Sequence, residues 1–149
     1  MSTRMSRDEW GLRLAEATAQ RGTCLRRQVG CVLVDERGRV LSTGYNGVAS
    51  GEPHCDETAP CLGAGFHSGE RLDLCVATHA EQNALIQCRD TDAIFTCYVT
   101  VSPCISCVKL LMNTGCLRIV FREGYAENAE NLWVGTQRAR TYGREWVKV

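Results

Sequence analysis

His79-Ala80-Glu81 and, later in the chain, Pro103-Cys104-Ile105-Ser106-Cys107 are the two stretches around which the fold of this sequence can be organised. The first offers an imidazole and a carboxylate, and the second offers two sulfurs. Because residues three apart share one face of a helix, Cys104 and Cys107 can bind one ion together. With His79 they supply three ligands for a tetrahedral zinc and leave its fourth position open, as in catalytic zinc sites.

Glu81 follows His79 by two residues, so a helix turns its side chain about 200° away from that of His79. The carboxylate is therefore predicted to carry protons beside the metal rather than to bind it. A zinc ion in such a site lowers the pKa of a bound water to about 7. The pattern favours a hydrolytic reaction, with a purely structural zinc site and a thiol redox motif as the alternatives.

Composition narrows the class of protein. The 149 residues are expected to form one domain, residues 1–149. The ligand pattern described above makes zinc its expected cofactor. The formal net charge is zero, which favours a small substrate, because proteins that bind long nucleic acid need a basic surplus. Ten cysteines in a chain without a secretory signal over Met1 to Arg7 favour metal binding over disulfides. We therefore expect a cytoplasmic protein with no membrane partner.

Hydrophobic periodicity predicts an α/β fold. A helix capped by Ser6 should run to about Arg21, with Trp10, Leu14 and Ala17 facing the core. Strands are predicted over 28–35, 40–45, 95–101, 117–121 and 146–149. Helices are predicted over 79–88 and 103–113, capped by Thr78 and Ser102, and more weakly over 126–137. Both faces of the first strand are apolar, so it should be central in the sheet.

These motifs resemble the cytidine deaminase superfamily and, within it, the deoxycytidylate (dCMP) deaminase family. The resemblance covers residues 24–125 and rests on five segments: Gln28–Val32, Gly44–Gly47, His54-Cys55, His79–Ala84 and Ser102–Cys107. It implies a three-layer α/β/α sandwich with a mixed central sheet and both ligand-bearing helices on one face. It also implies that the chain converts dCMP and water to dUMP and ammonia, which supplies thymidylate synthesis, with Glu81 as the catalytic acid and base.

Two alternatives to dCMP deamination stay open. One is a deaminase of another base or nucleotide, such as 5-substituted dCMP or tRNA adenosine. The other is a catalytically silent zinc-bound protein that binds nucleotides, against which the intact Glu81 argues. His79 argues against a free-cytidine deaminase, which usually has Cys at that position, and the Cys-rich loop over 48–77 argues against a tRNA adenosine deaminase.

The resemblance suggests substrate contacts. Asn46 is similar to the family's hairpin asparagine that meets the substrate sugar, with a plain turn residue as the alternative. Tyr125 is similar to a pocket tyrosine, with core burial as the alternative. Arg26 or Arg27 is expected to meet the 5′-phosphate, because guanidinium suits phosphate geometry, with a solvated surface as the alternative.

Four cysteines resemble the positions from which some family members build a second, structural zinc: Cys24, Cys55, Cys61 and Cys75. His54 or His67 is an alternate ligand, and free buried cysteines are the alternative interpretation. Leu74 stands where close relatives often have His, so the ligand set stays open. The resemblance further implies a homo-oligomer, which in some members is a hexamer, and dCTP and dTTP as effectors, with Mg²⁺ accompanying a nucleotide effector.

Overall fold

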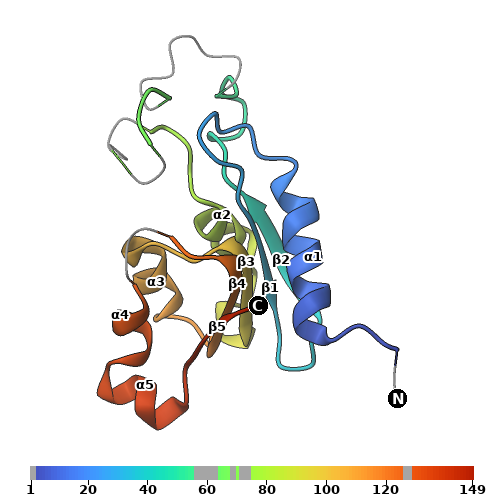
Figure 1. Ribbon diagram of the computed structural model, residues 1–149, viewed down its shortest axis with the longest axis vertical. Helices are drawn as coiled ribbons and strands as arrows, with labels where there is room; N and C mark the ends of the chain where they lie inside the picture. Colours follow the sequence, from blue (N-terminus) through green and yellow to red (C-terminus); the bar gives the residue numbers. More distant parts are fainter. Residues whose placement is uncertain (1–2, 56–63, 68–69, 71–74, 126–128) are drawn as a thin grey trace.

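The computed structural model describes residues 3–55, 64–67, 70, 75–125 and 129–149. Its centre is a five-stranded sheet in the order β2-β1-β3-β4-β5 (Figure 1). The first two strands, β1 (Gly30–Val34) and β2 (Val40–Tyr45), form an antiparallel hairpin. β1 is also antiparallel to β3 (Thr96–Val101), beyond which β4 (Arg118–Glu123) and β5 (Glu145–Lys148) run parallel to β3. The expected mixed sheet is confirmed.

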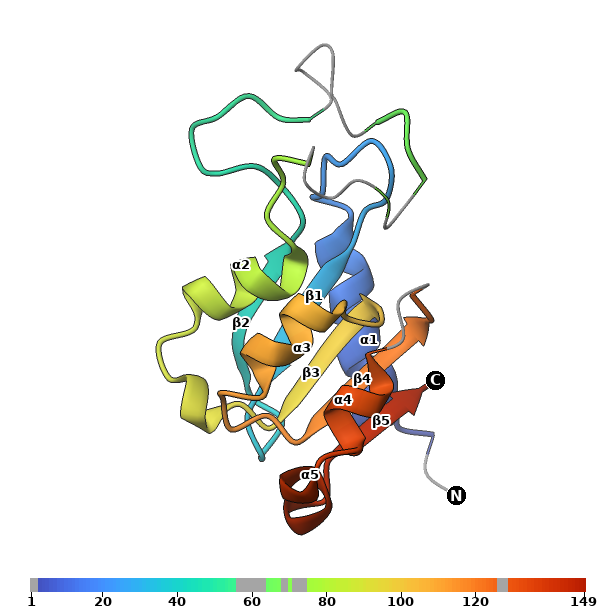
Figure 2. The same cartoon turned by 90° about the vertical axis from the view of Figure 1, so that its left-hand side faces the viewer.

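Helices cover both faces of the sheet (Figure 2). α1 (Arg7–Ala19) packs on one face, against Val32, Val34 and Tyr98. The other face is covered by three helices: α2 (Ala80–Gln87), α3 (Ile105–Leu111) and α4 (Glu130–Val134). Two short elements complete the described chain: the 3₁₀ helix η2 (Thr91–Ala93) and the helix α5 (Gln137–Tyr142). This arrangement confirms the three-layer α/β/α sandwich with α2 and α3 on one face.

The central strand β1 is buried along its whole length. Cys31 and Leu33 enter the core under α2 and α3, whereas Val32 and Val34 enter the core under α1. Successive side chains of a strand point to opposite faces, so a strand between two helical layers needs apolar residues at every position. The prediction of a central strand is confirmed.

The face of α1 that meets the sheet differs from the predicted one. Trp10 is 39% exposed, whereas the buried residues are small or of medium size: Gly11, Leu12, Ala15 and Ala19. The reason is close packing, since a Cβ added to Gly30 would lie 1.9 Å from the carbonyl oxygen of Ala15. The prediction is therefore wrong for Trp10 and Ala17, which are exposed, whereas Leu14 is partly buried against the core under α1. The helix approaches the strand too closely for a bulky side chain such as that of Trp10.

Helix boundaries also differ in a way that affects the site. α2 begins after His79, which is its N-cap in place of Thr78, and α3 begins after Cys104, which is its N-cap in place of Ser102. The single weak helix predicted over 126–137 is α4 followed by the separate α5; residues 126–128 lie outside the described part of the chain. None of the helices in the described ranges is long and apolar enough to span a membrane.

Replacing Gly30 with Ala is expected to lower the free energy of unfolding by about 2 kcal/mol or more, because the new methyl group meets the α1 backbone rather than a movable side chain. Urea unfolding measures the change. Gly65→Ala is the control, since a Cβ there meets nothing within 4 Å. A Gly30→Ala protein as stable as the parent would contradict the close helix–strand packing.

Candidate active site

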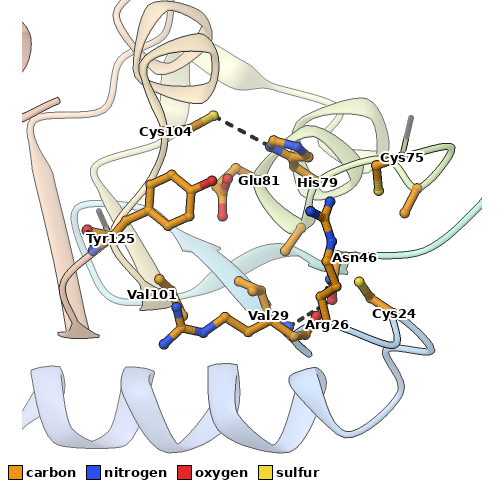
Figure 3. A pocket seen from close by; sticks show the side chains of 14 residues that line it. Cys24, Arg26, Val29, Asn46, Cys75, His79, Glu81, Val101, Cys104 and Tyr125 are labelled. Atoms are coloured by element: carbon orange, nitrogen blue, oxygen red, sulfur yellow. Dashed lines mark hydrogen bonds between the residues drawn. The ribbon is translucent and has the colours of Figure 1, made fainter. Parts of the chain in front are cut away.

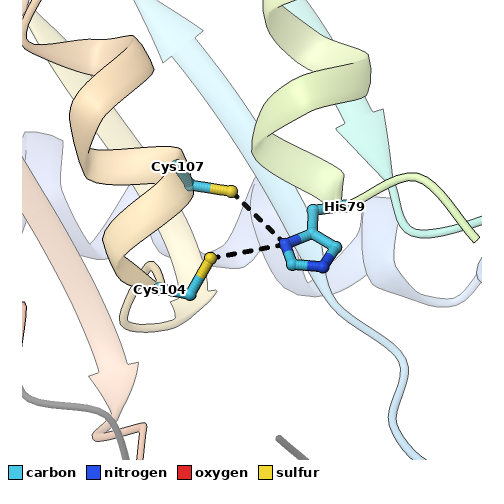
Figure 4. Close-up of side chains that lie close together, drawn as sticks. All are labelled: His79, Cys104 and Cys107. Atoms are coloured by element: carbon cyan, nitrogen blue, oxygen red, sulfur yellow. Dashed lines mark hydrogen bonds between the residues drawn. The ribbon is translucent and has the colours of Figure 1, made fainter. Parts of the chain in front are cut away.

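His79, Cys104 and Cys107 converge from the starts of two helices (Figure 4). The Nδ1 atom of His79 lies 3.5 Å from Sγ of Cys104 and 3.4 Å from Sγ of Cys107. Within the described residues this is the single group of three or more His, Cys, Asp or Glu side chains whose donor atoms lie close enough together to hold a metal ion. The predicted triad is brought together in space.

The distances fit a zinc ion. With Zn–N near 2.0 Å and Zn–S near 2.3 Å, tetrahedral geometry separates a nitrogen ligand from a sulfur ligand by about 3.5 Å. Both measured separations from His79 agree with that value. One nitrogen and two sulfurs are ligands that zinc prefers, and three protein ligands leave a fourth coordination position for water or substrate.

A hydrogen bond between the two thiols shifts their pKa values in opposite directions. The hydrogen bond from Cys107 is the largest influence on Cys104 and lowers the pKa of its thiol to about 4, and the His79 ring acts in the same direction. The same hydrogen bond raises the pKa of Cys107. At neutral pH the pair therefore already carries one thiolate, which is the form of cysteine that binds a metal.

Hydrogen bonds fix α2 on the hairpin and thereby fix His79. The Ser42 hydroxyl donates to the carbonyl of Ala84 (2.8 Å), and the Asn83 amide donates to the carbonyl of Tyr45 (2.8 Å). The backbone N–H of His79 donates to Oε1 of Gln82 (2.9 Å), which satisfies a donor at the helix start. The sheet therefore fixes the backbone position from which the His79 imidazole extends.

Glu81 lies in the pocket beside the triad (Figure 3). Its side chain is 4% exposed, and it is in hydrogen-bond contact with Cys107. Burial raises the pKa of its carboxyl to about 6, against the opposing effect of that hydrogen bond. A carboxyl that holds a proton more readily than usual is suited to proton transfer near neutral pH.

The same pocket contains every residue that the sequence suggested for substrate contact. Arg26, Arg27, Asn46 and Tyr125 all line it. In Figure 3, Arg26 and Tyr125 lie on opposite sides of the pocket, with Glu81 and His79 along a third side. Apolar side chains complete the walls: Val29, Ala77, Ala80 and Val101. A pocket with a few polar groups on apolar walls is the usual form of a small-molecule site.

Asn46 is held by the chain that precedes β1. Its Oδ1 accepts the N–H of Val29 (2.8 Å), and its Nδ2 donates to the carbonyl of Arg27 (2.6 Å). A side-chain amide has two donor hydrogens and two acceptor positions, so one of each remains for a ligand. Asn46 therefore both positions the arginine segment and faces the pocket.

The two arginines have different partners. Arg26 donates to the backbone carbonyls of His67 (3.0 Å) and Glu70, which are neutral groups. Arg27 instead forms an ion pair with the carboxylate of Glu123. The charge of Arg26 is thus left uncompensated by these contacts, whereas that of Arg27 is balanced by an acid.

Sequence reasoning missed two residues at this site. Glu123 ends β4 two residues before Tyr125, and only the folded chain brings it to Arg27. Ser102 was expected to cap a helix, but its hydroxyl oxygen accepts the N–H of Tyr125 (2.7 Å). Its place directly before Pro103 and Cys104 is the one signal in the sequence that pointed to it.

The candidate ligands of a second zinc are only partly described. Cys24 and Cys75 line the pocket, and Cys55 is buried, whereas His54 and His67 are exposed. Cys61 lies outside the described residues. The described members do not form a second group of three donors. Three cysteines outside both candidate sites are also free: Cys88, Cys97 and Cys116.

Comparison with known proteins identifies the family. The model of the cytidine and deoxycytidylate deaminase zinc-binding region matches residues 5–123, which include the whole triad and Glu81. The chain belongs to the cytidine and deoxycytidylate deaminase family. Membership of this family agrees with the zinc-type donor set and with the sandwich fold.

Three relatives illustrate the similarity. The deoxycytidylate deaminase of Mycobacterium phage D29 is 42% identical over 126 residues, which cover 78% of this chain and 97% of that protein. The deoxycytidylate deaminase of Schizosaccharomyces pombe is 36% identical over 128 residues, covering 82% of this chain and 38% of that protein. The crystal structure of dCMP deaminase from the cyanophage S-TIM5, in complex with dCMP and dUMP, superimposes with a TM-score of 0.72 at 27% identity and covers 98% of this chain and all of that one. This deaminase-family chain thus spans nearly all of the phage relatives but well under half of the yeast one.

Replacing Cys107 with Ser is expected to remove about one zinc ion per chain from the purified protein, because a hydroxyl does not replace a thiolate ligand. Metal analysis after dialysis measures the loss, and circular dichroism checks that the variant is folded. Cys88→Ser is the matched control, since Cys88 lies outside the triad and should leave the zinc content unchanged. An unchanged zinc content in Cys107→Ser would contradict the assignment of the site.

Proposed function

We propose that this chain hydrolyses dCMP to dUMP and ammonia and so supplies thymidylate synthesis. The observation that carries the proposal is the position of Glu81, buried in the same pocket as His79 and Cys104. Arg26, Arg27, Asn46 and Tyr125 around that pocket supply groups for a nucleotide. Named deoxycytidylate deaminases among the relatives support the same substrate.

The metal-binding triad and Glu81 have different roles in the proposed reaction. His79, Cys104 and Cys107 would hold the zinc, which when bound would lower the pKa of a water so that it can act as a nucleophile towards the amine-bearing carbon of the base near neutral pH. Glu81 accepts a proton from the attacking water and delivers it to the adjacent ring nitrogen. It then transfers the second water proton to the amine, so that the carbon–nitrogen bond breaks and ammonia leaves.

The remaining residues bind and orient the nucleotide in this proposal. Val29 and Val101 pack against the base, and Tyr125 closes the pocket on the side opposite Arg26. The unused donor and acceptor of Asn46 bind the sugar hydroxyl. The two arginines bind the 5′-phosphate, for which guanidinium is well suited. Fixing the base in this way excludes bulk water from the reacting carbon.

Glu81→Gln is expected to lower kcat for dCMP at least about a hundredfold, because the amide keeps the shape of the side chain but cannot carry the proton. Release of ammonia from dCMP measures the rate, with 5-methyl-dCMP, CMP, deoxycytidine and adenosine as comparison substrates. The zinc content of the variant should equal that of the parent, since Glu81 is not a ligand.

Full turnover by a folded, zinc-bound Glu81→Gln protein would contradict the mechanism. Activity of the parent on deoxycytidine or adenosine alone would retain the mechanism but replace dCMP as the substrate. A zinc-bound parent protein with no activity on any of these compounds would favour a nucleotide-binding protein without catalysis.

We further propose a second, structural zinc in the cysteine-rich loop. Cys55 is 4% exposed although the three residues before it are exposed, and Cys24 and Cys75 approach the same pocket wall. Sulfur ligands can order a long loop that has little apolar core of its own. Three expectations from the sequence stay predictions: a homo-oligomer, regulation by dCTP and dTTP, and Mg²⁺ bound together with a nucleotide effector.

Metal analysis tests the second zinc directly. The parent protein is expected to carry about two zinc ions per chain, and the Cys24→Ser/Cys55→Ser variant about one, because closed structural sites need four ligands. The Cys107→Ser variant distinguishes the sites, since it should lose the other ion. A parent content of one zinc would remove the second site from the proposal.

A further inference from the structure

The cation of Arg27 is balanced by an acid at the edge of the pocket. Glu123 is the last residue of β4, and its carboxylate contacts the Arg27 guanidinium. Its backbone is fixed there, because its carbonyl accepts the N–H of Ser102 (2.8 Å) and it pairs in register with Val101. Val101 and Ser102 both line the pocket, so Glu123 approaches the site from an anchored strand end.

The ion pair between Arg27 and Glu123 is exposed enough for a phosphate to replace Glu123 as the partner of Arg27. The side chain of Glu123 is 64% exposed and that of Arg27 is 33% exposed. Exposed pairs of this kind contribute little to stability, because water screens them and ordering two long side chains costs entropy. A phosphate dianion makes stronger, bidentate hydrogen bonds to guanidinium than an exposed carboxylate does.

The neighbouring Arg26 differs from Arg27 in the groups that it contacts. Arg26 donates to the carbonyl oxygens of His67 and Glu70, so these contacts hold its position without cancelling its charge. Among the described residues, an incoming phosphate thus meets one arginine held by neutral carbonyls and one arginine that must first release its carboxylate. After that release, the negative charge of Glu123 remains beside the phosphate.

Building on the proposed function, we propose that Glu123 determines how many phosphates the substrate may carry. Its carboxylate competes with the 5′-phosphate for Arg27 and then repels any further phosphate, so that the pocket prefers a nucleoside monophosphate. Like charges brought together at a binding site are an effective means of rejecting a wrong ligand. A nucleoside without phosphate leaves the Arg27–Glu123 pair undisturbed, so its binding does not depend on Glu123.

The test compares Glu123→Gln with the parent protein in binding and in catalysis. Calorimetry measures the Kd of dUMP and of dUDP, and steady-state assays compare deoxycytidine, dCMP and dCDP. Glu145→Gln is the matched control, because Glu145 is a similarly exposed acid (53%) paired with Arg118 on the neighbouring strands, away from the pocket lining.

Glu123→Gln is expected to bind dUMP about two- to fivefold more tightly, as loss of a weak competing pair implies. The gain should be larger for dUDP, which also loses the repulsion. The KM for dCMP should fall with kcat unchanged, and the parameters for deoxycytidine should not move. In an Arg27→Gln background the gain for dUMP should disappear, because the two residues act through one contact.

Unchanged or weaker dUMP binding by Glu123→Gln would overturn the inference, as would an equal effect on deoxycytidine. Either result alongside an active parent would leave the proposed deamination of dCMP intact. A parent protein that neither deaminates dCMP nor binds dUMP would overturn both.

Discussion

The site depends on one geometric constraint: the first turns of α2 and α3 have to meet closely enough for a nitrogen and two sulfurs to surround one ion. The sheet meets this constraint through its topology. β3 and β4 are parallel, so the chain crosses between them through α3, whose start follows the carboxyl end of β3. α2 enters at the same edge after the β1–β2 hairpin. Sites at the carboxyl ends of parallel strands are common for this reason.

The packing of α2 sets how near the two helix starts come. A Cβ on Gly44 would lie 2.4 Å from both the carbonyl oxygen of Ala80 and the nitrogen of Ala84, so the helix rests directly on the strand. Gly30 serves α1 in the same way on the opposite face. The hairpin is held between two closely approaching helices, and a rigid support of this kind keeps functional side chains at a defined distance.

Local patterns were sufficient to predict the metal triad, the α/β class and the buried strand β1, whereas the sandwich was implied by the resemblance to the deaminase family. Their signals are short-range: ligand spacing, alternation and runs of apolar residues. The buried face of α1 was not predictable in this way, because Gly30 and Ala15 determine it through contact between distant segments. The pairing of Glu123 with Arg27 and the true function of Ser102 were missed for the same reason. The substrate contacts of Asn46, Tyr125, Arg26 and Arg27 stay predictions, although one pocket contains all four.

His79 and Cys104 are the N-caps of α2 and α3, so two of the three candidate ligands also mark the helix starts. Ala84 and Val108, one in each helix, are both fully buried in the same core, so core packing contributes to the relative position of the two helix starts. Variation at such core positions is transmitted to metal affinity as well as to stability. In this fold the hydrophobic core therefore supports the metal site through side chains that never touch the ion.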